Sequence, residues 1–222
     1  MNKRVFEIYQ YLAPAVLAPA TFLLWRHACG GNIWLALMAW LLPIVYAYIV
    51  PGVGTNILKV WEFDTRFRMG RFRPHHGFVF GSATAALAWA VHGQPARAWP
   101  DAVRAGLIFS SVLGFWNVLY DVEALRSGIL RVYNQPWADE KGAEAIAFDY
   151  APWFFAGFGA MYGIGLSVAE IFASRAGFGA GEFAFTFPIT LSAAMALPVL
   201  GYRRRSFKMH GHSGCFPVRR GA

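Results

Sequence analysis

Long apolar runs constrain the fold of this chain more than any motif does. The run from Leu35 to Val45 is continuous and contains no charged residue. A helix needs about 20 mostly apolar residues to cross a hydrocarbon core of about 30 Å, whereas a strand of a membrane barrel alternates apolar and polar residues over about ten positions. We therefore predict an all-α, polytopic membrane helix bundle with about six transmembrane helices. Six stretches approach the required length, the third being the shortest: Ile8–Trp25, Ile33–Val53, Phe78–Val91, Ala105–Tyr120, Ala151–Ala173 and Phe183–Tyr202.

Composition excludes a soluble globular domain and a disordered chain. Of the 222 residues, 57% are hydrophobic and only 14% are charged, against about 45–50% and about 25% in soluble domains, and disorder requires low hydrophobicity. The segments between the apolar runs are too short for a separate catalytic module. We expect one transmembrane domain over residues 1–202 and a basic cytoplasmic tail over residues 203–222.

Basic residues predict the orientation of the helices. With six spans, sixteen of the twenty Lys and Arg fall on one face, in the N-terminal segment, residues 54–77, residues 121–150 and the C-terminal segment. Lys and Arg in short loops mark the cytoplasmic side, so both termini are expected there, in a bacterial-type cytoplasmic membrane. The net charge of +8 follows from this topology and from attraction to anionic lipids. Membrane lipids are the expected partners, and nucleic acid is not; membrane-protein partners and self-association stay open.

Several local features refine this picture. Lys3 and Arg4 before an apolar run also suit a signal peptide, but we expect the first span to be retained as a helix. Gly159 and Gly163 form a GxxxG pair, which lets another helix approach closely, here within the bundle. Cys29 and Cys215 lie on opposite faces and are not expected to pair.

The loop before the third span carries the first group of candidate site residues. Arg-Phe-Arg occurs twice, at residues 66–68 and 71–73, and is followed by His75 and His76. Interleaved rings and guanidinium groups suit either an interfacial segment or a site for an anionic head group or diphosphate. We expect Arg71, Arg73 and His75 to bind substrate. We also expect this basic loop, residues 54–77, to touch residues 121–150, because that loop is acidic and lies on the same face.

Two acids at the same membrane level complete the candidate site. Asp121 follows Asn117 by four residues, so the two share a helix face, and a carboxylate at the membrane boundary is costly without a partner or a purpose. Asp149 precedes the fifth span, where it suits a helix cap or a catalytic acid. A structural ion pair between Asp121 and the basic loop is an equal alternative to a catalytic carboxylate. We expect Asp121, His76 and Asp149 to be the catalytic candidates.

The sequence leaves the function open between three classes. The first is an enzyme acting on a lipid or isoprenoid-like substrate at the cytoplasmic interface, with proton transfer by Asp121 or His76. The second is a non-catalytic subunit or assembly factor of a larger membrane complex, and the third is a small transporter. The spacing of the histidines and cysteines indicates no metal site, and the sequence does not indicate which cofactor, if any, the protein binds.

Overall fold

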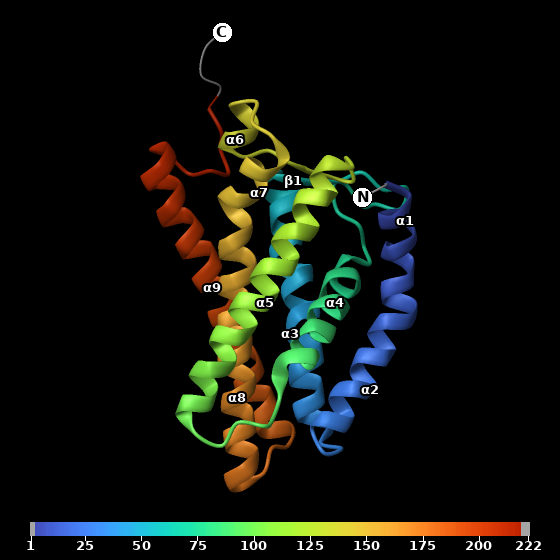
Figure 1. Cartoon of the computed structure of the whole chain (residues 1–222), viewed down its shortest axis with the longest axis vertical. Coiled ribbons are helices and arrows are strands. Elements are labelled where there is room, and N and C mark those ends of the chain that lie inside the picture. Colours follow the sequence, from blue (N-terminus) through green and yellow to red (C-terminus); the bar gives the residue numbers. More distant parts are fainter. Residues whose placement is uncertain (1–2, 219–222) are drawn as a thin grey trace.

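The computed structural model describes residues 3–218, which form an all-α bundle with one small strand pair (Figure 1). Most of the long helices run along the same axis of the molecule. The first helix begins, and the last helix ends, at the same end of the bundle. Helices (α), π-helical segments (η) and strands (β) follow in the order α1 (Lys3–Leu12), η1 (Ala13–Leu17), α2 (Ala18–Ala28), α3 (Ile33–Gly52), η2 (Val53–Ile57), β1 (Trp61–Phe63), α4 (His76–His92), α5 (Trp99–Arg126), β2 (Leu130–Val132), α6 (Gln135–Ala138), α7 (Ala143–Ala151), η3 (Pro152–Gly157), α8 (Phe158–Ala176) and α9 (Ala180–His210).

Five helical segments are long and apolar enough to cross a membrane, so the protein is an integral membrane protein. The third predicted span, α4, is shorter than these. Its 17 residues extend about 25 Å at 1.5 Å per residue, less than a hydrocarbon core of about 30 Å. It packs among α1–α3 and α5, which places its first turn inside the bundle. The five long segments are Lys3–Ala28, Ile33–Ile57, Trp99–Arg126, Ala143–Ala176 and Ala180–His210.

Proline residues coincide with widened, π-helical turns in three of these spans. Pro14 lies in η1, Pro51 lies two residues before η2, and Pro152 begins η3. Proline has no backbone N–H and its ring clashes with the preceding turn, and a π-helical turn accommodates such a break without ending the helix. The spans therefore continue through these prolines. As a result the fifth span, which the sequence places from Ala151, begins at Ala143.

The GxxxG pair packs inside the bundle, as predicted. A Cβ atom at Gly163 would lie 2.5 Å from the carbonyl oxygen of Ala105, and one at Gly159 would lie 2.6 Å from that of Phe109. Backbone of α8 therefore touches backbone of α5 directly, and only glycine fits at these two positions.

The two loops at the end of the bundle where α1 begins are joined by backbone pairing. Strands β1 and β2 are antiparallel, with Glu62 opposite Arg131. The predicted contact between residues 54–77 and residues 121–150 is confirmed. We expected basic residues of the first loop to face acidic residues of the second. One ion pair between the loops reverses this arrangement, because Arg131 of the second loop lies 3.8 Å from Asp64 of the first.

The C-terminal segment begins later than expected. Helix α9 continues past Tyr202 and ends at His210. The following residues return to the bundle, where the Gln135 amide Nε2 donates to the carbonyl of Val218 at 2.8 Å and the Val218 N–H donates back to Gln135 Oε1 at 2.9 Å. Residues 203–210 thus belong to α9, and Val218 contacts α6.

Candidate functional site

Three of the six candidate residues line one cavity. Arg73, His76 and Asp121 surround a volume of about 80 Å³, at the end of the bundle where α1 begins and α5 ends. They come from the segment before α4, the first turn of α4 and the last turns of α5. Aromatic side chains form much of the remaining wall: Tyr9, Tyr46, Trp61, Phe63, Phe80, Tyr120, Tyr150, Phe154 and Phe155.

The Asp121 carboxylate is held by a phenol from another helix. The hydroxyl of Tyr150, in α7, donates to Asp121 Oδ2 at 2.5 Å, and both side chains are buried. Asn117 lines the same cavity, as its spacing predicted, but its amide Nδ2 donates to the Leu113 carbonyl at 2.8 Å. A short hydrogen bond to a buried carboxylate is strong, so Tyr150 fixes the acid in position. No sequence pattern singles out Tyr150, which lies between Asp149 and Pro152.

Arg73 brings a fixed positive charge into the cavity. Its side chain is only 2% exposed, and its guanidinium lies over the Phe63 ring, 4.7 Å from the centroid. Arg73 Nε donates to His76 Nδ1 at 2.9 Å. Because Nδ1 accepts this bond, the His76 ring is neutral and carries its proton on Nε2. Arginine does not lose its proton in proteins, so the charge is permanent.

Arg73 and Asp121 line the same small, largely aromatic cavity, so their charges interact. Arg73 acts electrostatically on both Tyr120 and Asp121. In the described part of the chain, the acid is bonded to Tyr150 and makes no direct ion pair with Arg73. The positive end of the α4 dipole also lies here, since α4 begins at His76. The site therefore offers a cation, a helix N-terminus and one carboxylate to a ligand.

Arg71 and His75 lie outside the lining of this cavity. The Arg71 guanidinium donates to the Lys59 carbonyl at 2.9 Å and lies over the Tyr133 ring. His75 stacks on two rings, with its centroid 5.3 Å from that of Tyr11 and 6.0 Å from that of Phe67. Partial burial, with the charge of Arg73, lowers the pKa of His75. Both side chains therefore make their contacts outside this cavity.

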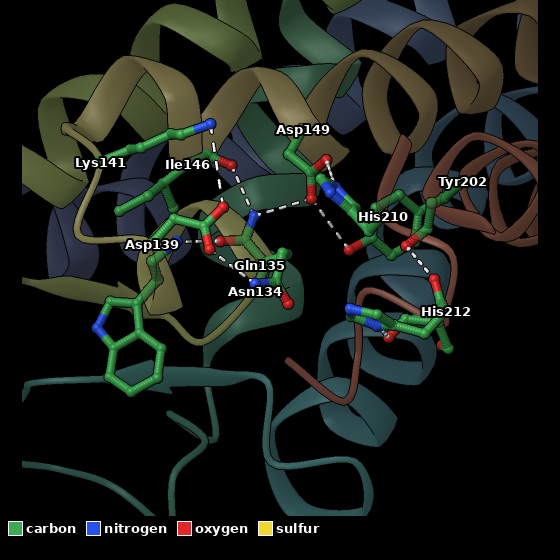
Figure 2. Close-up of polar contacts among 12 residues, drawn as sticks. Asn134, Gln135, Asp139, Lys141, Ile146, Asp149, Tyr202, His210 and His212 are labelled. Atoms are coloured by element: carbon green, nitrogen blue, oxygen red, sulfur yellow. Dashed lines mark hydrogen bonds and ion pairs between the residues drawn. The ribbon is translucent and has the colours of Figure 1, made fainter. Parts of the chain in front are cut away.

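Asp149 belongs to a different cluster, shown in Figure 2. Its Oδ1 lies 2.9 Å from His210 Nε2, while Asn134 Nδ2 and the Tyr202 hydroxyl donate to its Oδ2 at 3.1 Å and 3.3 Å. The prediction that Asp149 caps the fifth span is wrong, because that span begins with α7 at Ala143 and Asp149 lies in the last turn of α7. The acid instead joins α7 to the end of α9.

A third buried acid, Glu170, lies toward the opposite end of the bundle. Glu170 Oε1 is 2.6 Å from His92 Nε2, and its Oε2 accepts from the Ala96 N–H at 2.9 Å. The carboxylate and the imidazole are both buried. An acid within an apolar run is a signal for such a pair, but its histidine, at the end of a different helix, could not be assigned from the sequence.

Comparisons with known proteins give no further guidance. No protein-family model, curated protein or solved structure matches the chain. Within residues 3–218, no group of three or more His, Cys, Asp or Glu side chains is arranged to hold a metal ion. The function is therefore inferred from the geometry of the cavity.

Proposed function

We propose that this protein is a membrane enzyme that acts on a lipid or isoprenoid-like substrate at the cytoplasmic interface. The observation that carries the proposal is the meeting of Arg73, His76 and Asp121, from three segments of the chain, around one cavity. A stable bundle has no need of a buried arginine and a buried carboxylate that form no direct pair, because burying charge is costly. Such groups in a cavity are typical of functional sites.

Each side chain has a role that its contacts support. Arg73 binds an anionic or strongly polar group of the substrate, assisted by the N-terminus of α4. Asp121 is the proton-transfer group, with the Tyr150 hydroxyl holding its carboxylate in one orientation. His76, which accepts from Arg73, can donate a hydrogen bond through Nε2.

The size of the cavity limits what enters it. A volume of about 80 Å³ holds about five to eight water molecules, since each needs roughly 10–15 Å³ by this measure. Only the polar end of an amphiphile fits, and its hydrocarbon part must lie elsewhere. The basic end of the bundle, where the cavity lies, is the cytoplasmic end in this proposal.

Conversion of lipids by the reconstituted protein tests the proposal. Wild-type protein in vesicles made from the total lipid extract of its host membrane is expected to alter at least one lipid species, detected by mass spectrometry. Asp121→Asn and His76→Ala should each reduce this conversion at least tenfold while the protein stays folded. Asp64→Asn, which changes an exposed carboxylate at the same end, is the matched control.

The proposal fails if the wild type and Asp121→Asn leave identical lipid profiles. It also fails if Asp121→Asn converts lipid as fast as the control. Identical profiles would favour the alternative that the chain is a non-catalytic subunit of a membrane complex.

A further inference from the structure

A second cavity lies directly beside the first. Its volume is about 300 Å³, and it is enclosed by the end of α3 with η2, by η3, by α9 and by the C-terminal segment. This volume falls at the lower end of the range for small-molecule sites, about 300–1,000 Å³. Four residues line both cavities, so the two volumes adjoin: Val50, Trp61, Tyr150 and Phe154.

The exposed lining of the second cavity is apolar except for Arg203. Four of its lining residues are between 38% and 45% exposed: Ile49, Val53, Leu58 and Val199. All four belong to, or directly follow, segments that are long and apolar enough to cross a membrane. A surface of this kind inside a bilayer faces hydrocarbon chains rather than water.

The partition between the cavities consists of aromatic rings. The Trp61 ring lies 5.7 Å from that of Tyr150 and 5.4 Å from that of Phe154, centroid to centroid. Trp61 fits here only because residue 54 is glycine, since a Cβ atom there would lie 2.2 Å from Trp61 Cε3. The hydroxyl of Tyr150, on the same partition, holds Asp121.

We propose that the second cavity binds the hydrocarbon chain of the same amphiphile whose polar end occupies the first cavity. This inference rests on the proposed function, because it assigns the part of the substrate that the 80 Å³ cavity cannot hold. Continuity of the two linings supports one molecule across both cavities. The substrate class is then an amphiphile with an anionic or polar end and one long acyl or isoprenyl chain, which enters from the bilayer.

Photo-crosslinking tests where the chain lies. The probe is a 16-carbon fatty acid with a diazirine at mid-chain, added to the full chain in nanodiscs of dioleoyl phosphatidylcholine. We expect labelled peptides to map to residues 49–58 and 195–203. Val199→Trp, which fills the cavity, should reduce this labelling at least fivefold, whereas Leu200→Trp, at a neighbouring position that is 62% exposed, should leave it within twofold of the wild type.

Two results would overturn the inference. Equal labelling of Val199→Trp and Leu200→Trp, or labelling confined to other segments, would show that the chain does not occupy this cavity. Labelling that Val199→Trp abolishes but Arg73→Gln leaves unchanged would show that the cavity holds a separate lipid.

The same set of variants separates this inference from the proposed function. Loss of lipid conversion in Asp121→Asn would still support the enzyme if the labelling pattern failed. Val199→Ala, which enlarges the cavity and should keep the labelling, and Met195→Phe, which also fills it, provide a second pair if Val199→Trp does not fold.

Discussion

Replacing Tyr150 with phenylalanine removes one hydroxyl group and leaves the aromatic ring in place. The ring keeps its contacts with Trp61 and Phe154, so the change isolates the 2.5 Å hydrogen bond to Asp121. The buried carboxylate then loses its donor. We expect Tyr150→Phe to lower the free energy of unfolding by about 1–3 kcal/mol, the cost of leaving a buried polar group unsatisfied.

The size of this loss of unfolding free energy depends on the charge of the group that accepts the hydrogen bond. In an Asp121→Asn background the acceptor is a neutral amide, and the same change should cost about 0.5–1 kcal/mol. Hydrogen bonds between membrane helices show coupling energies of about 0.6 kcal/mol on average and up to about 1.7, and a charged acceptor strengthens them. The expected coupling between the two positions is therefore about 1–2 kcal/mol.

A double-mutant cycle measures this coupling directly. The four proteins are unfolded reversibly in mixed micelles with increasing denaturing detergent. Tyr133→Phe is the control, because it removes a hydroxyl that donates to Glu62 at 2.8 Å in a less buried, extramembrane position, where the cost should be below about 1 kcal/mol. A coupling energy under about 0.3 kcal/mol would refute the conclusion that Tyr150 holds Asp121 in position.

Three further predictions concern packing, pH and orientation. Gly163→Val should lower the free energy of unfolding by about 1–3 kcal/mol because α5 leaves no space for a side chain, and Gly181→Ala, at an open position, by less than about 0.5 kcal/mol; equal effects would contradict the packing. The hydrogen bond with the N-terminal lysine lowers the pKa of Asp64, so its small stabilisation is present above about pH 4 and is lost as pH falls through the folded-state pKa. The stability difference between wild type and Asp64→Asn should shrink over that range, and a difference independent of pH would exclude the pair. In a cysteine-free background, an impermeant maleimide should label Lys141→Cys only from the cytoplasm and Gln94→Cys only from outside; the reverse would invert the topology.

The membrane helices were predictable because long apolar runs are a local signal. Their ends were not, since residues at the boundary are polar or aromatic and several helices continue through them. The apolar run predicts that the fifth span begins at Ala151, one residue before Pro152. The backbone instead passes through η3, and Asp149 consequently lies at the end of a helix rather than before one.

The site was predictable in part, because its residue types are unusual at a membrane boundary. Sequence could not distinguish Arg71 from Arg73, which are two residues apart. The distinction arises from a reverse turn at Gly70, where φ is +65°, and from a backbone bridge between Met69 and Phe72. This turn leaves Arg71 on the loop surface and carries Arg73 inward, a result that depends on contacts with distant segments.

The hydrogen bond between Tyr150 and Asp121 also has a consequence for biosynthesis. A growing chain inserts the helix that carries Asp121 before the helix that carries Tyr150 has been made. Until the second helix arrives, the carboxylate has no phenol beside it, and an unpartnered acid in a bilayer draws its helix toward the interface. The hydrogen bond that fixes Asp121 can therefore form only after the segment that carries Tyr150 has been made.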